Sequence, residues 1–360
     1  TCDCEDWDRN GSSVSPCKHM VRIKYTDDEI KAMLEKLGGT GVKVVKPKAK
    51  FVNGVDEAPI FSEGVKDIPF ILDLRPRLAE VGKIKIGGKS DKRTGSGVLL
   101  PTKFDHFEIS TLMKDDEGRL IMDDELNERL ELVTVDAEGK KHLCDKSKEL
   151  DIALCYDDPR MNMPTFYGYF TQSRLVCRGN GRVAVRRDAD GSESREIVCD
   201  RTKCPDYLAK RCKPYGRLSV ILTGANRVGG VFVFRSTGWN AIENLLSAMV
   251  FISSKEGTNG ILAGIPLKLR LMEMTVAPRG IGRNIPIFVP NLEFEGSLVD
   301  LKEAGLAERD LRRRQGVDMQ EIEGADAKAL KARLEQEAVE DTDEIAGEFY
   351  PEGEELHEES

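Results

Sequence analysis

Four closely spaced cysteines in the middle of the chain constrain the fold more than any other feature. Residues 182–187 alternate apolar and charged side chains, a turn sequence follows, and residues 195–198 return as a second strand. Because a hairpin places its two ends side by side, Cys177 and Cys199 are expected to become neighbours although they are distant in sequence.

Cys204 and Cys212 complete the set. A continuous α-helix between them would separate their Cα atoms by about 12 Å, too far for two ligands of one ion. A short helical turn is therefore expected, beginning at Pro205 and ended by Lys213-Pro214. Four thiols at the base of a hairpin suit a structural, tetrahedral Zn²⁺ ion with the ligands Cys177, Cys199, Cys204 and Cys212. Unrelated reduced cysteines and an iron–sulfur cluster are the alternatives.

The sequence after the cysteines predicts two strands and a helix. Residues 216–224 indicate a buried strand that ends in a turn, residues 229–235 a second strand, and residues 239–253 an amphipathic helix opened by Thr237. The apolar positions of that helix are 239, 242, 245, 246, 249 and 250.

Two segments carry a resemblance to a known family. CKPYGRLSVIL, from Cys212, and GGVFVFRSTGWNAIENLLSAM, from Gly229, resemble the recombination directionality factor-like proteins of phages and integrative elements, over residues 66–295. The resemblance implies a non-enzymatic accessory factor. Such a factor binds a serine integrase on its DNA attachment sites and switches the reaction from integration to excision.

The first residues contain a second arrangement of ligand type. Cys2-Asp-Cys4 and Cys17-Lys-His19 form a CxC…CxH pattern that resembles the SWIM zinc finger, with Cys2, Cys4, Cys17 and His19 as zinc ligands. The β-hairpin that precedes the first cysteine in that family is missing here. The resemblance implies DNA or protein binding without catalysis. A disordered terminus that contains cysteines is the alternative.

The distribution of charge hides a basic body behind an acidic tail. Residues 317–360 carry 16 Asp and Glu against three Lys and Arg, a net charge of −13, while the whole chain carries −9, so the remaining 316 residues carry +4. Such a tail is expected to aid solubility or to compete with DNA for the body.

Basic side chains in two regions are candidates for contact with DNA or a partner. Lys83 and Lys85 lie on one face of a predicted strand, and a basic, glycine-containing loop with Lys103 follows it. A second strand, within residues 262–275, presents a wet face. The candidates are Lys83, Lys85, Lys89, Lys92, Arg93, Lys268 and Arg270. A solvated surface is the alternative for the loop.

No motif in the sequence assembles an active site. The four histidines are scattered, and P-loop, HExxH and nucleophile-elbow patterns are missing. Asp105 and His106 are adjacent on a strand and are expected to face opposite sides, which disfavours a catalytic pair. Two alternatives to the integrase partner stay open: a zinc-containing DNA-binding module, including one that handles single strands, and a metal-dependent hydrolase.

These patterns predict an α+β fold, mostly an antiparallel sheet with a zinc-stapled hairpin and a few helices. The expected domains are 1–38 (SWIM-like fragment and helix), 39–65 (linker), 66–316 (the directionality factor-like domain) and 317–360 (acidic, partly disordered tail), with a helix at 298–315. No apolar run is long enough to span a bilayer, and nine cysteines with metal-like spacing fit a reducing cytoplasm.

Overall fold

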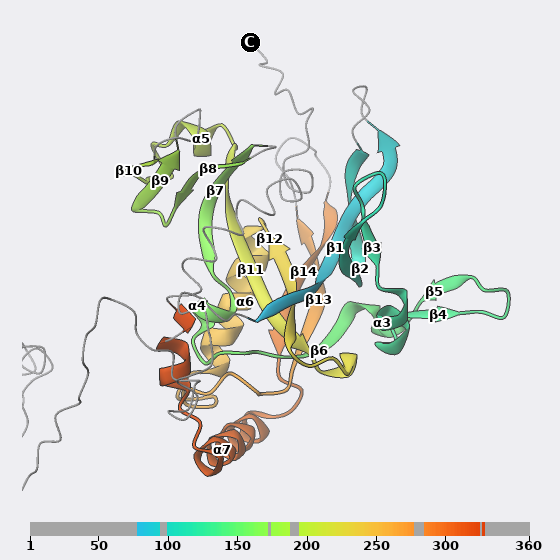
Figure 1. The fold of residues 1–360 in the computed structure, drawn as a ribbon, viewed down its shortest axis with the longest axis vertical. Coiled ribbons are helices and arrows are strands. Elements are labelled where there is room, and N and C mark those ends of the chain that lie inside the picture. Colours follow the sequence, from blue (N-terminus) through green and yellow to red (C-terminus); the bar gives the residue numbers. More distant parts are fainter. Residues whose placement is uncertain are drawn as a thin grey trace, which may run out of the picture. The chain divides into compact units, whose positions relative to one another are not determined.

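The computed structural model describes residues 78–93, 99–171, 174–187, 194–276, 284–324 and 326–327 (Figure 1). Contacts divide the chain into one unit of residues 1–73 and a second of residues 74–360, and every described residue belongs to the second. The predicted SWIM-like fragment, with Cys2, Cys4, Cys17 and His19, therefore lies outside the described residues. So do the predicted linker and the tail beyond residue 327, and these domain boundaries stay predictions.

One branched sheet of twelve strands dominates the described residues. Its main path has the order β10-β9-β8-β7-β11-β12-β1-β2-β3, from which β6, β13 and β14 branch at β11, while β4 and β5 form a separate ribbon. The strands are β1 (Ala79–Arg93), β2 (Leu99–Lys114), β3 (Leu120–Met122), β4 (Val133–Val135), β5 (Lys141–Leu143), β6 (Glu149–Ala153), β7 (Thr165–Thr171), β8 (Arg174–Gly179), β9 (Val183–Arg187), β10 (Ser194–Val198), β11 (Cys212–Leu222), β12 (Gly230–Ser236), β13 (Leu267–Val276) and β14 (Ile285–Glu293). Only β1 and β12 pair in parallel among these strands. The predicted sheet-dominated, mostly antiparallel α+β fold is confirmed.

β11 is the strand that joins the parts of the sheet. Its first residues, from Cys212 to Gly216, pair with β7. Its middle pairs with β12, and its last two residues, Ile221 and Leu222, pair with β6. One strand therefore connects the cysteine-containing end of the sheet to the branch that holds β13 and β14.

The helices are few and mostly short. They are α3 (Asp124–Arg129), α4 (Pro159–Asn162), α5 (Pro205–Leu208), α6 (Trp239–Ile252) and α7 (Leu298–Gln315), with 3₁₀ turns η3 (Asp145–Lys148) and η4 (Thr223–Ala225). None of these helices is long and apolar enough to cross a bilayer.

α6 supplies one side of the main hydrophobic core. Ile242, Leu245 and Met249 repeat at helical spacing and belong to the same buried cluster as Phe232 and Phe234 of β12. This confirms the predicted helix and most of its apolar face, although Gly238 is the N-cap and Thr237 is not. Val250, which the sequence pattern also assigned to the apolar face, is exposed instead.

α7 has the predicted bounds, and its ends explain them. The Ser297 side chain accepts from the Asp300 backbone N–H, and the Asp300 carboxylate accepts from the Ser297 backbone N–H, which is a capping box. Gly316 ends the helix with φ of 67°, a left-handed conformation that favours glycine. Three arginines in the last turn match the negative end of the helix dipole.

The face of β11 and β12 opposite to the one that carries Phe232 and Phe234 holds a buried charged cluster, to which β1 also contributes. Arg217 and Arg235 oppose each other across β11 and β12 and donate to the Glu80 carboxylate at 3.0 and 3.1 Å. Burial alone would raise the pKa of Glu80, but Arg235, Arg217 and Lys83 hold it below its usual value. The cluster is therefore a part of the sheet that depends on Glu80 staying ionised.

Candidate functional site: the cysteine lobe

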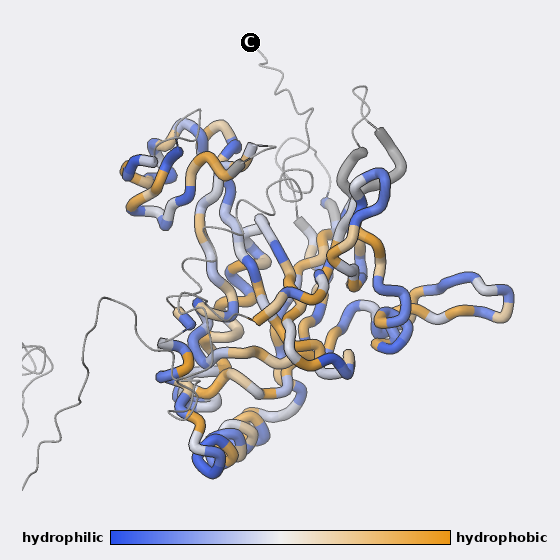
Figure 2. Tube along the Cα trace, in the orientation of Figure 1, coloured by the Kyte–Doolittle hydropathy of each residue, from blue (hydrophilic) through white to orange (hydrophobic). Residues whose placement is uncertain are grey.

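The four cysteines lie in one part of the sheet, which we call the cysteine lobe and define as residues 174–213. It contains β8, β9, β10, α5 and the start of β11, which lie together at one end of β7 and β11 (Figure 1). Figure 2 shows hydrophilic and hydrophobic residues alternating along this part of the chain. The predicted hairpin is present, because β9 and β10 pair antiparallel from Val183↔Val198 to Arg187↔Ser194.

Cys177 and Cys199 reach the same region by different routes. Cys177 lies on β8, opposite Arg186 of β9. Cys199 directly follows β10, and its backbone N–H donates to the Arg182 carbonyl at 2.9 Å. A Cβ atom at Gly179 would stand 2.6 Å from the Cys199 Sγ atom, so the absence of a side chain at this position gives Cys199 its place over β8.

Cys204 and Cys212 bracket a short helical turn. α5 begins at Pro205, as predicted, and Cys204 is its N-cap. The predicted end at Lys213-Pro214 is wrong: the helix ends at Leu208, Lys210 takes a left-handed φ of 58°, and residues 213–214 pair with β7 inside β11. The αL residue, not the proline, stops the helix and lets the chain turn back to Cys212.

The four thiols influence one another electrostatically. Burial raises the pKa of Cys212 to about 12, and the nearby thiols of Cys177, Cys204 and Cys199 add to the rise. All four cysteines are half-buried and in the free, non-disulfide form. Within the described residues, however, no group of three or more His, Cys, Asp and Glu side chains is arranged closely enough to hold a metal ion. The lobe thus brings together four thiols, which are ligands that zinc prefers, but their arrangement does not yet form a metal-binding group.

A buried carboxylate holds two arginines beside the thiols. Asp206 of α5 has a side chain only 6% exposed and accepts from Arg211 Nη2 at 2.7 Å and from Arg186 Nη1. Burial alone would raise the pKa of the Asp206 carboxyl, but the hydrogen bonds from Arg186 and Arg211 hold it below its usual value. The Arg211 guanidinium also lies over the Tyr169 ring, 5.9 Å from its centroid.

The cysteine lobe concentrates positive charge that the whole-chain average conceals. Residues 174–213 contain eleven Arg and Lys against six Asp and Glu, a net charge of +5. This exceeds the +4 of all residues before the acidic tail. The five lysines and two arginines predicted from sequence to contact DNA or a partner all lie in other segments. The positive charge of the lobe was not predicted, although a local count of charge would have found it.

The basic residues named from sequence alone have other surroundings. Lys83 is only 5% exposed and lies beside the Glu80 cluster, so it does not meet a phosphate group at the surface. The expected basic loop is wrong, because the backbones of Lys89, Lys92 and Arg93 belong to β1, while Lys103 belongs to β2 and pairs with Gly87. The side chains of residues 89–93 lie outside the description, and Lys85 is half-buried.

Lys268 and Arg270 lie on β13 among carboxylates. Lys268 forms ion pairs with Asp151 at 3.2 Å, Glu295 at 3.3 Å and Glu149 at 3.6 Å. Arg270 pairs with Glu149 and with Glu293, each at 2.9 Å. The predicted wet face exists, but four acidic side chains surround its two cations, so it is not a basic surface.

The adjacent Asp105 and His106 do interact, contrary to the prediction. His106 Nδ1 lies 2.9 Å from Asp105 Oδ1, and its Nε2 lies 3.2 Å from Glu108 Oε1. The register of β2 against β1 shifts here, since Lys85 opposes Glu108 while Gly87 opposes Lys103. Alternation of side chains fails in such a bulge, which explains the error.

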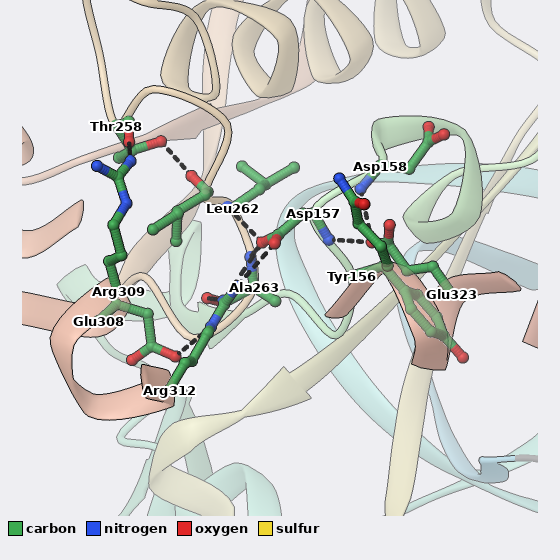
Figure 3. Close-up of polar contacts among 12 residues, drawn as sticks. Tyr156, Asp157, Asp158, Thr258, Leu262, Ala263, Glu308, Arg309, Arg312 and Glu323 are labelled. Atoms are coloured by element: carbon green, nitrogen blue, oxygen red, sulfur yellow. Dashed lines mark hydrogen bonds and ion pairs between the residues drawn. The ribbon is translucent and has the colours of Figure 1, made fainter. Parts of the chain in front are cut away.

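A second cluster joins α7 to the loops that follow β6 and α6 (Figure 3). The Asp157 carboxylate accepts from the backbone N–H groups of Leu262 and Ala263, at 2.8 and 2.9 Å, and from Arg312 of α7. Glu323 accepts from the backbone N–H groups of Asp157 and Asp158. We call these contacts the C-terminal clasp. The strand predicted from Leu262 begins only at Leu267, because Asp157 binds the backbone of the preceding residues.

The clasp borders a cavity of about 640 Å³. Its lining combines the polar loop at Asp157–Arg160 with Leu246 and Val250 of α6 and with Met319 and Glu323 beyond α7. Val250 and Phe251, neighbours in the last turn of α6, are each 58% exposed.

The fold and these sites define a sheet-dominated α+β protein with a basic cysteine lobe. A family model for Gp3-like proteins, described as recombination directionality factor-like, matches residues 81–295. The match covers more than half of the chain, which belongs to this family and so to proteins associated with recombination. No curated protein and no solved structure matches the chain. The family match includes the cysteine lobe and the sheet, whereas α7 lies beyond it.

Proposed function

We propose that this protein is a non-enzymatic accessory factor that binds a serine integrase on DNA and biases recombination toward excision. The family match over residues 81–295 carries this proposal. It covers nearly the whole described sheet together with α6, so the resemblance concerns the folded body and not an isolated motif.

The mechanism is differential binding. An accessory factor changes the direction of a reaction only if it binds the complex that leads to excision more tightly than the complex that leads to integration. Reversing a preference from 1:99 to 99:1 requires a difference of about 10⁴-fold in affinity. The factor itself needs no reacting group, because the integrase breaks and joins the DNA.

The exposed end of α6 is our candidate surface for the integrase. Val250 and Phe251 place two large apolar side chains side by side at the surface, next to the cavity that the clasp borders. Aromatic side chains such as Phe251 are enriched at protein interfaces relative to the rest of a protein surface. The double variant Val250→Ser/Phe251→Ser should weaken capture of the integrase. Val228→Ser is the matched control, because Val228 is fully exposed in the loop between η4 and β12.

We also propose that one Zn²⁺ ion organises the cysteine lobe by drawing closer four thiols that, among the described residues, are not yet arranged to hold a metal ion. Four thiols of the preferred chemistry lie in mutual electrostatic range, and Arg186 lies beside Cys177 and Cys204, where it would balance the negative charge of a tetrathiolate centre. Bound zinc would supply the deprotonation that burial of Cys212 opposes. Its role would be structural, since four protein ligands leave no position for substrate.

Metal content of the purified protein tests the zinc proposal. Cys199→Ser should lose one equivalent of zinc, whereas Cys144→Ser, which replaces a free cysteine outside the lobe, should lose none. One equivalent that remains in Cys199→Ser, with two in Cys144→Ser, would support the SWIM-like set at Cys2, Cys4, Cys17 and His19. Iron with a visible absorption band would instead assign an iron–sulfur cluster.

Recombination in vitro tests the main proposal. The cognate integrase is given attL and attR substrates with and without this protein. Excision only in its presence supports the proposal. Lack of any effect on the direction of recombination, together with failure to capture the integrase, would refute it.

A further inference from the structure

Three arginines of the lobe are connected by strand register and by one shared carboxylate. Arg195 of β10 and Arg186 of β9 directly oppose each other, and opposed residues of an antiparallel pair share one face of the sheet. Asp206 then links Arg186 to Arg211, because its carboxylate accepts from both. We call Arg195, Arg186 and Arg211 the guanidinium row.

The row is built so that its charge is not cancelled. A single carboxylate, Asp206, serves two of the three arginines, and it is buried while Arg211 and Arg195 are exposed. Arg195 has no ion-pair partner among the described residues, and neither does the exposed Lys210, which precedes Arg211. Asp206 therefore fixes the direction of two guanidinium groups and leaves the row positive.

Two further cations belong to the same lobe. Arg201 and Lys203, both exposed, lie in the loop between β10 and α5. The Arg201 guanidinium stacks over the Trp239 ring at 5.3 Å, and Trp239 contacts Tyr167. A tetrathiolate zinc centre would contribute two negative charges, which lowers the charge of the lobe from +5 to +3 without changing its sign.

We propose that the guanidinium row binds the phosphate backbone of duplex DNA. Arginine forks match phosphate oxygens in a bidentate manner, and guanidiniums held by a carboxylate or by aromatic rings lose little freedom on binding. Duplex DNA carries about one negative charge per 1.7 Å of its axis, so several cations of one surface can be engaged at once. The contact is independent of base sequence, since the row offers cations without base-reading groups.

This inference goes beyond the proposed integrase contact, which we place on α6. It assigns the protein its own hold on DNA through a different part of the molecule. A factor with both contacts would recognise integrase and DNA together.

Fluorescence anisotropy of a labelled duplex of random sequence, with the full-length protein, tests the inference. Wild-type binding should weaken steeply with salt. Arg195→Glu/Lys210→Glu should weaken binding at least about tenfold and reduce the slope of log K against log salt by about 2. Lys302→Glu/Arg314→Glu, which makes the same change of charge at exposed positions on α7, should leave both nearly unchanged.

The outcomes separate clearly. Equal loss in both double variants, or no binding by the wild type at low salt, would overturn the inference. So would a lobe that prefers polyglutamate to duplex DNA, because that assigns an acidic protein as the partner. A melting temperature of Arg195→Glu/Lys210→Glu equal to that of the wild type shows that this variant is folded. Lys210→Gln is a milder variant that should give a smaller loss of DNA affinity. Wild-type protein that binds DNA but does not promote excision would leave this inference standing and remove the proposed function alone.

Discussion

Arg312 of α7 donates to the Asp157 carboxylate at 2.6 Å, although α7 lies outside the part of the chain that the family match covers. Arg312 also donates to Glu308 and to the Ala263 carbonyl, at 2.8 and 2.6 Å (Figure 3). The Asp157 carboxylate in turn orders the chain at Leu262 and Ala263. Residues after the matched region are thus bound to its core loops.

Removal of the Arg312 guanidinium should destabilise the protein. Arg312 is 11% exposed at its side chain, so Arg312→Met leaves Asp157 and Glu308 without this donor in a poorly hydrated site. We expect a loss of about 2 kcal/mol in the free energy of unfolding. Arg313→Met is the control: its side chain is 82% exposed, and the change should cost less than about 0.5 kcal/mol. Urea denaturation measures both, and equal losses would contradict a special role for Arg312.

The Glu80 cluster should make stability depend on acid pH. The pKa of Glu80 is lower in the folded protein than its ordinary value of 4.5, so the stabilisation is complete above that value and is lost as pH falls through the folded pKa. Glu80→Gln should cost about 2 kcal/mol or more at pH 7, since Arg217 and Arg235 lose a buried carboxylate. The difference between wild type and variant should shrink below pH 4.5. Urea denaturation at several pH values measures this difference. A difference in the free energy of unfolding that stays constant across this pH range would contradict the prediction.

His106 should titrate above its ordinary value. The hydrogen bond to Glu108 is the largest cause that raises its pKa from 6.5, burial opposes the rise, and Asp105 adds to it. The stabilisation from protonated His106 is therefore full below pH 6.5 and is lost as pH rises through the folded pKa. NMR titration of the ring should show that Glu108→Gln lowers the pKa more than Asp105→Asn does. The reverse order would show that the bulge in β2 places the ring differently.

Gly179 should resist replacement because Cys199 occupies the space beside it. A Cβ atom there would lie 2.6 Å from Cys199 Sγ and 2.7 Å from the Ala184 Cβ. Gly179→Ala should therefore lower the free energy of unfolding by about 1–3 kcal/mol, as overpacking does. Gly324→Ala, where a Cβ meets open space, should be neutral or slightly stabilising. If zinc is bound, Gly179→Ala should also reduce its retention against a chelator.

Local patterns predicted local structure well in this chain. The β9–β10 hairpin follows from alternation and a turn sequence, and α6 and α7 follow from apolar spacing and a basic last turn. α5 begins at Pro205 as expected. Its predicted end is wrong because the left-handed conformation of Lys210, and not Pro214, ends the helical turn. A positive φ at a non-glycine residue leaves little trace in sequence.

Features that depend on distant segments escaped prediction. Lys83 is buried because β1 pairs with β12, which lies far along the chain. The residues near Lys83 contain no pattern that predicts this parallel pairing. Asp206 is buried with Arg186 of β9 and with Arg211, which directly precedes β11, as its partners. The charge count of residues 174–213 was visible in the sequence, but only the structure shows that Arg195, Arg186 and Arg211 form one row.

β11 gives this arrangement a thermodynamic consequence. The same strand begins at Cys212 in the lobe and ends at Leu222, which is buried in the main core. Unfolding of the lobe would remove the pairing of the first half of β11 with β7, and we expect both ends of β11 to melt in one transition. Any molecule that binds the folded lobe stabilises the whole sheet by mass action, by about 2.7 kcal/mol at a hundredfold excess over its Kd. Occupancy of the lobe can thus be followed as a rise in the melting temperature of residues far from it.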